Sequence, residues 1–61
     1  MNNIEIKKIM KESRFFNYEI ASAIGITEIS FSKWFRKQLT ESQQEAILRA
    51  INKLKSGTVN E

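Results

Sequence analysis

The stretch that decides the fold is IGITEISFSKWF, residues 24–35, in which one glycine separates two short apolar patterns. Glycine directly after the apolar Ile24 is typical of a helix C-terminus, because a left-handed residue with a Cβ pays a steric cost there. Thr27 is a good N-cap for a second helix, and Glu28 then lies at the positive end of that helix. The stretch therefore predicts two helices joined by a sharp corner at Gly25.

The side chains around this corner meet the packing needs of two closely crossing helices. A small residue is required four positions before Gly25, and Ala21 meets that requirement. Ile26 follows the glycine and is expected to fill the corner. Phe31 and Trp34, three residues apart, share the inward face of the second helix. Together these positions indicate a helix-turn-helix, in which a turn of about three to four residues often contains glycine.

The remaining sequence also predicts helices, because proline is absent and the second glycine, Gly57, lies near the end. Thr40 and Gln43 match a capping box, and Asn17 is a plausible N-cap. Strand signals are weak, so the expected fold class is all-α, a compact four-helix domain with a central helix-turn-helix. The predicted helices span residues 3–13, 18–24, 28–36 and 41–55 of a domain over residues 1–57, followed by a frayed tail over 58–61.

The expected core follows from apolar side chains that repeat at helical spacing. Phe15 and Phe16 are expected to form an apolar plug between the first two helices. The other expected core residues are Ile6, Ile9, Met10, Ile20, Ala21, Ile24, Phe31, Trp34, Ile47, Ala50, Ile51 and Leu54.

The composition argues against several classes of function. Among the 61 residues there is no cysteine, histidine or aspartate. The usual zinc ligands are therefore missing, and no usual nucleophile–base pair can be assembled. We expect no enzymatic activity, no metal, no cofactor and no small-molecule substrate.

The net charge of +3 and the pI of about 9.5 suit a nucleic-acid partner, although many unrelated small proteins share them. The N-terminal residues carry charges inside their apolar pattern and do not resemble a signal peptide. No apolar stretch approaches the ~20 residues that a membrane-spanning helix needs. The sequence therefore predicts a cytoplasmic domain without a membrane partner.

Residues 17–35, NYEIASAIGITEISFSKWF, resemble the helix-turn-helix of phage repressor and Cro-like proteins. The wider chain resembles very small helix-turn-helix proteins of phages and conjugative elements. The resemblance implies a lambda-repressor-like fold, a double-stranded DNA partner and a role as a transcriptional regulator, a repressor of a phage or mobile element. It also implies that the helix over residues 28–36 lies in the major groove. Repressor-like domains usually continue with Asn-Gly-Lys and a proline, whereas this chain has Arg36-Lys37-Gln38 and no proline.

The resemblance, together with the outward face of that helix, predicts four base-contacting residues. Lys33 can donate to guanine, Ser32 can pair with several bases, Ile29 can meet a thymine methyl and Glu28 can accept from cytosine. Each has a simpler explanation. Glu28 also stabilises the positive helix end, Lys33 can be a solvated lysine, and Ile29 can pack on a neighbour.

A second set of residues is expected to contact phosphates. In repressor-like proteins the start of the first motif helix touches a phosphate, and Asn17 and Tyr18 occupy that place here. N-capping by Asn17 and partial burial of Tyr18 are the alternatives. The complete expected set is Asn17, Tyr18, Thr27, Arg36, Lys37 and Gln38.

The basic residues Lys7, Lys8 and Lys11 form the solvated face of an amphipathic helix or add a long-range field that speeds DNA encounter. A homodimer on a two-fold site is expected, since one small module gives weak specificity alone. Ile4 and Leu48 lie off the main apolar stripes and are expected at the dimer seam, unless they pack within the monomer. The competing functions are a helix-turn-helix scaffold that binds and inhibits a protein, and an accessory factor in recombination or excision.

Overall fold

The computed structural model describes residues 2–57, which fold into four helices. They are α1 (Asn3–Ser13), α2 (Asn17–Ile24), α3 (Glu28–Trp34) and α4 (Glu41–Gly57). No strand occurs among the described residues, so the predicted all-α, four-helix fold class is confirmed. The tail predicted over residues 58–61 lies outside the described part of the chain.

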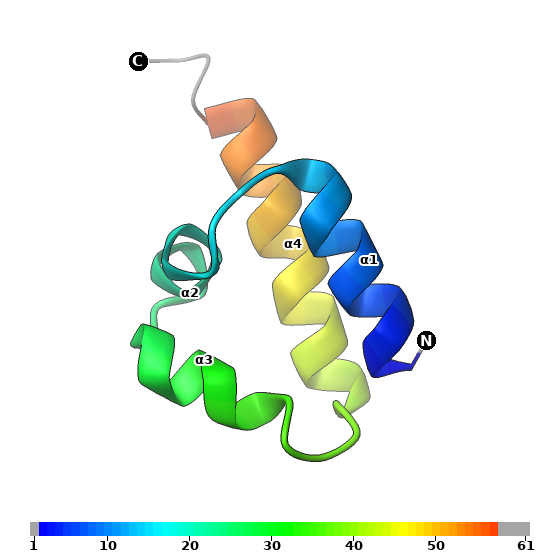
Figure 1. Ribbon diagram of the computed structural model, residues 1–61. Coiled ribbons are helices and arrows are strands. Elements are labelled where there is room, and N and C mark those ends of the chain that lie inside the picture. The colour runs from blue at the N-terminus through cyan, green and yellow to red at the C-terminus, as the bar shows by residue number, and fades with distance from the viewer. Residues whose placement is uncertain (1, 58–61) are drawn as a thin grey trace.

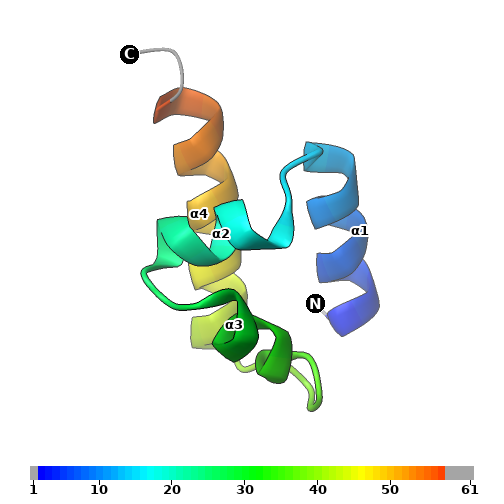
Figure 2. The same ribbon diagram turned by 60° about the vertical axis from the view of Figure 1, so that its left-hand side comes forward.

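The longest helix, α4, is the element on which α1 and α2 pack. α1 and α4 lie side by side and run in the same general direction, while α2 lies across α4 (Figures 1 and 2). α2 also packs against α3, which lies below α2 in the view of Figure 2. All four helices and the α3–α4 loop contribute to the buried core, which consists of Ile6, Met10, Ile20, Ala21, Phe31, Leu39, Ile47, Ala50 and Ile51.

The corner between α2 and α3 has the backbone that the glycine predicted. Gly25 has φ of +101°, in the left-handed region, and its N–H donates to the Ala21 carbonyl at 2.9 Å. The Ile26 N–H donates to the same carbonyl at 3.0 Å, and the Thr27 hydroxyl oxygen accepts from the Ser30 N–H at 3.1 Å. A Cβ on Gly25 would meet no atom within 4 Å, so the glycine is needed for its backbone conformation and not for space.

The start of α2 differs from the prediction that Asn17 is its N-cap. The N-cap is Phe16, which has extended backbone angles, and Asn17 is already helical. The Glu19 carboxylate accepts a hydrogen bond from the Phe16 N–H at 2.8 Å. This backbone donor at the start of α2 therefore has a partner without an Asn side chain at the N-cap. Phe16 is 65% exposed and does not join the core, whereas Phe15 packs partly buried against it.

α3 ends at Trp34, two residues before the predicted end at Arg36. The Phe35 N–H donates to the Ser32 carbonyl at 3.2 Å and the Arg36 N–H to the Lys33 carbonyl at 3.1 Å. These bonds span three residues and tighten the last turn, after which the chain leaves the helix. Arg36 therefore belongs to the α3–α4 loop.

α4 begins with the predicted capping box and extends past the predicted end at residue 55. The Thr40 N–H donates to the Gln43 side chain at 3.0 Å, and the Gln43 N–H donates to the Thr40 hydroxyl at 3.1 Å. The helix continues through Ser56 to Gly57, and the Ser56 hydroxyl donates to the Asn52 carbonyl at 3.1 Å. The end of α4 therefore lies two residues beyond the predicted one.

Several apolar residues lie elsewhere than the periodicity predicted. Leu39, in the loop before α4, is only 3% exposed and belongs to the core. Leu48 packs partly buried against the core, which fits the alternative of packing within the monomer, whereas Ile4 is 77% exposed. Four residues that were expected in the core are only partly buried at its edge, namely Ile9, Ile24, Trp34 and Leu54.

Candidate nucleic-acid interface

The rotation of α3 is fixed by one buried aromatic side chain. Phe31 is 1% exposed, and its ring lies 5.9 Å from the ring of Trp34 and 5.3 Å from the ring of Phe35, measured between centroids. Because this aromatic cluster faces the core, the opposite face of α3 must face solvent. That outward face carries the four residues predicted to contact bases, Glu28, Ile29, Ser32 and Lys33, and all four are exposed.

One side of α3 borders a groove of about 300 Å³ that we name the α3–α4 groove. It brings Lys33 together with three of the predicted phosphate-contacting residues of the loop, and no carboxylate lines it. The lining residues are Lys33, Trp34, Arg36, Lys37, Gln38, Thr40 and Gln43. The exposed cations of this groove are suited to bind anions.

The loop that carries Arg36 and Lys37 is tied to the first residue of α1. The Asn3 Nδ2 donates to the Lys37 carbonyl at 2.8 Å, and the Leu39 N–H donates to Asn3 Oδ1 at 2.9 Å. A single amide thus holds both ends of a three-residue segment, and buried Leu39 anchors it from beneath. This role of Asn3 was not predictable from the sequence, since the two contacts span 34 and 36 residues along the chain.

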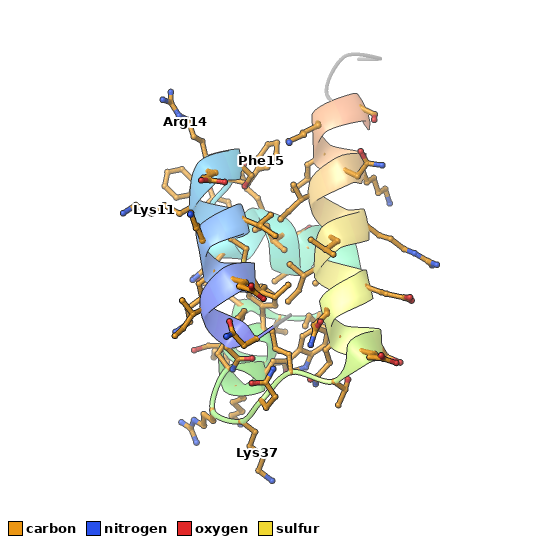
Figure 3. All side chains as sticks on the ribbon, turned by 90° about the vertical axis from the view of Figure 1, so that its right-hand side faces the viewer. Lys11, Arg14, Phe15 and Lys37 are labelled. Carbon is orange, nitrogen blue, oxygen red and sulfur yellow. The ribbon has the colours of Figure 1, made fainter. Side chains whose placement is uncertain are left out.

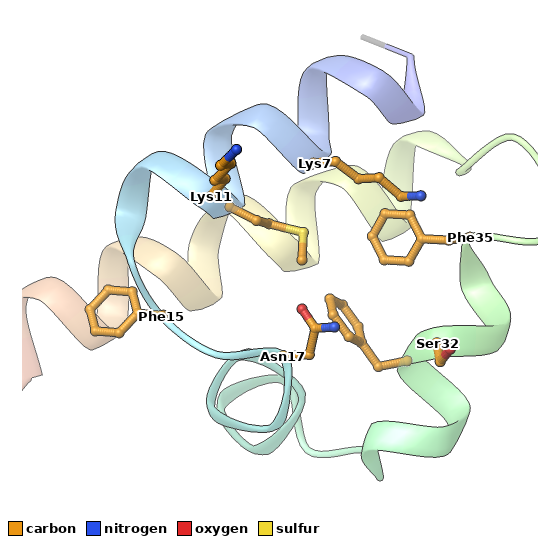
Figure 4. A pocket seen from close by; sticks show the side chains of 8 residues that line it. Lys7, Lys11, Phe15, Asn17, Ser32 and Phe35 are labelled. Atoms are coloured by element: carbon orange, nitrogen blue, oxygen red, sulfur yellow. The ribbon is translucent and has the colours of Figure 1, made fainter.

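The other side of α3 borders a second groove of about 330 Å³, the α1–α3 groove (Figure 4). It brings Ser32 and Asn17 together with two lysines that the sequence placed on a solvated helix face, Lys7 and Lys11. The lining residues are Lys7, Met10, Lys11, Phe15, Asn17, Phe31, Ser32 and Phe35. The lysine spacing of four residues showed that both share one face of α1, but not that this face turns towards α3.

Two of the predicted phosphate-contacting residues line neither groove. The Tyr18 ring stacks on the Phe16 ring, with centroids 5.6 Å apart and planes 10° apart, and Tyr18 is more than half exposed. The Thr27 hydroxyl donates to the Ser30 hydroxyl at 3.1 Å besides accepting from its N–H. Thr27 is therefore engaged in capping α3.

Two kinds of feature are not found among the described residues. Residues 2–57 include no cluster of three or more acidic, cysteine or histidine side chains that would hold a metal ion. Within the same residues no helix is long and apolar enough to cross a membrane. The polar side chains that line the two grooves carry basic, hydroxyl and amide groups, which can donate hydrogen bonds to an anion.

No protein-family model, curated protein or solved structure matches this chain. The support for a function therefore lies in the chemistry of α3 and of the two grooves beside it.

Proposed function

We propose that the protein binds double-stranded DNA sequence-specifically, with α3 in the major groove, as a transcriptional repressor of a phage or mobile element. The observation that carries the proposal is the free face of α3. Buried Phe31 orients it outward, and the α3–α4 groove places cations beside it. An α-helix with its side chains is about 10–12 Å across, which fits a major groove about 12 Å wide.

The exposed residues of α3 supply the donors and apolar groups that base edges require. Lys33 donates to the O6 or N7 of guanine, and the Ser32 hydroxyl pairs with several bases. Ile29, which is 71% exposed, contacts the methyl group of a thymine. Glu28 accepts from cytosine N4 and repels a wrongly placed phosphate.

Contacts to the phosphates set the position of α3 on the duplex. Arg36 and Lys37 lie in the α3–α4 groove directly after the helix, where they reach the backbone beside the bases that α3 contacts. Asn17 begins α2, and its exposed amide supplies a neutral donor. Gln38, Tyr18 and Thr27 complete the proposed set, with Thr27 acting through the α3 cap.

Specificity is completed by a second copy of the chain on a two-fold site. A single module of this size buries roughly 600–1,000 Å² on DNA, which gives weak specificity alone. A homodimer places two copies of α3 about one DNA turn apart, on two half-sites. Ile4 is the exposed apolar residue of α1 available to the dimer contact, since Leu48 packs within the monomer.

The experiment is selection of duplexes from a random pool at low salt, followed by comparison of three lysine or arginine variants. Lys33→Ala relaxes preference at particular base positions, because it removes a base contact worth about 1–3 kcal/mol. Arg36→Ala weakens binding to all sequences alike. Lys53→Ala, which removes an exposed lysine of α4 that lines neither groove, leaves the preference unchanged. Failure of the wild-type protein to retain any duplex overturns the proposal.

A second candidate function is protein binding, favoured by the exposed aromatic pair at the start of α2. Phe16 and Tyr18 are both more than half exposed and stack on each other, as side chains at protein interfaces often do. Under this alternative, Tyr18→Ala abolishes capture of a protein partner, and no duplex competes for it. Under the DNA proposal, selected duplex is retained by both the wild-type protein and Lys53→Ala.

A further inference from the structure

The two grooves lie on opposite sides of the exposed ridge of α3. At about 100° of rotation per residue, Ser32 and Phe35 face one side of the helix, and Lys33 and Trp34 face the other. The first pair lines the α1–α3 groove and the second lines the α3–α4 groove. Both grooves carry basic residues, and no carboxylate is among the residues that line either one.

A helix that enters the major groove has a sugar–phosphate backbone on each side of it. The groove is about as wide as a helix with its side chains, so both strands approach the flanks of α3. The α3–α4 groove receives one backbone through Arg36 and Lys37. The opposite flank of α3 then faces the other backbone, and the α1–α3 groove is the cavity on that flank.

We infer that Lys7 and Lys11 of α1 bind phosphates of the second DNA strand in the α1–α3 groove. The inference rests on the proposed function. It adds to that function which DNA strand is bound on each side of α3. Arg36 and Lys37 bind the strand on one side of α3, and α1 binds the strand on the other. Two backbones held at this spacing belong to a duplex, so single-stranded DNA of the same sequence fills only one of the two grooves.

The side chains of the α1–α3 groove are arranged for an external anion. The Lys7 Nζ lies 5.5 Å from the centroid of the Phe35 ring, a cation–π contact that holds its ammonium group beside α3 (Figure 4). Lys11 lies one turn further along the same face of α1, and Asn17 adds an exposed amide from α2. Lys8 lines neither groove, so it provides a lysine of the same helix for comparison.

The test compares two double variants that remove the same charge. Lys7→Ala/Lys11→Ala removes both proposed contacts, whereas Lys8→Ala/Lys53→Ala removes two lysines that line neither groove. The dissociation constant for the selected duplex is measured by fluorescence anisotropy from 50 to 200 mM salt. Each lost phosphate contact lowers the magnitude of the log–log salt slope by about 0.9, so the groove variant loses about 1.8 for each bound protomer. Per bound protomer, the fall in affinity between the two salt concentrations is then about 12-fold smaller than that of the wild-type protein.

The control variant keeps the wild-type slope, and Lys7→Arg/Lys11→Arg keeps it because the charges remain. Phosphate-ethylation interference tests the strand assignment. Within each half-site the wild-type protein shows interference on both strands, and Lys7→Ala/Lys11→Ala loses it on one of the two strands only. Thermal melting by circular dichroism confirms that every variant is folded.

Different results identify which proposal fails. Equal slopes for the two double variants, or interference lost equally on both strands within a half-site, overturn the role of α1 and leave DNA binding intact. Equal affinity of the wild-type protein for single-stranded and duplex DNA also overturns the inference. Failure of the wild-type protein to bind any duplex overturns the proposed function and, with it, the inference.

Discussion

Replacing Asn3 with alanine removes the amide that ties the α3–α4 loop to α1. Two hydrogen bonds are lost, one to the Lys37 carbonyl at 2.8 Å and one from the Leu39 N–H at 2.9 Å. The Leu39 N–H is partly buried, so water replaces Asn3 only incompletely as its partner. We therefore expect Asn3→Ala to lower the free energy of unfolding, although Asn3 is only the first residue of α1.

The magnitude follows from the two bonds and one compensating term. Each bond contributes about 1 kcal/mol net, so their loss costs about 2 kcal/mol. Alanine has a better helix propensity than asparagine, which returns about 0.5 kcal/mol. The expected net loss in the free energy of unfolding is about 1.5 kcal/mol, equivalent to roughly 6–12 °C in Tm for a domain of this size.

Urea and thermal unfolding followed by circular dichroism measure this loss. Asn52→Ala is the matched control, because Asn52 is an exposed asparagine of α4 whose backbone carbonyl, and not its side chain, makes the hydrogen bond to Ser56. Asn3→Asp keeps an acceptor for the Leu39 N–H but loses the donor to the Lys37 carbonyl, so its stability lies between those of the wild type and Asn3→Ala. If Asn3→Ala is as stable as Asn52→Ala, the reasoning about the loop is wrong.

Three further substitutions have signs and sizes that follow from the fold. Gly25→Ala, at φ of +101°, lowers the free energy of unfolding by about 1 kcal/mol through backbone strain, as urea titration measures. Arg14→Gly has the opposite sign, about 0.5 kcal/mol of stabilisation by the same titration, because Arg14 caps α1 at φ of +67° and its exposed side chain projects away from the fold (Figure 3). Leu39→Ala costs about 3 kcal/mol, detected as a lower urea midpoint, because it opens a cavity in the core. Unchanged midpoints for Gly25→Ala or Leu39→Ala, or a lowered one for Arg14→Gly, would contradict these assignments.

The helices and their corner were predictable from sequence because local rules determine them. The left-handed Gly25, the Thr27 cap and the capping box at Thr40 each depend on residues within a few positions of one another. The predicted end of α3 was wrong because nothing in the local sequence marks the tightening of the last turn at Phe35.

Features that depend on distant contacts were not predictable in the same way. The burial of Leu39 lies outside any helical period, so the apolar pattern did not reveal it. The Asn3 contact and the α1–α3 groove require knowledge of how α1 lies against α3 and its loop. The exposed face of α3 was predictable because Phe31 and Trp34 define the opposite face. The direction in which Lys7 points was not predictable, since the sequence pattern of a solvated lysine face is the same whichever way the helix is oriented.

The salt dependence of duplex binding by the wild-type protein tests the central claim most directly. Four cations are assigned to phosphates in each protomer, Lys7, Lys11, Arg36 and Lys37, which gives a log–log slope of about −3.6. The affinity of each bound protomer for its selected duplex should therefore fall about 150-fold between 50 and 200 mM salt. A fall of less than about 3-fold, smaller than that of a single phosphate contact, would contradict DNA binding through this face.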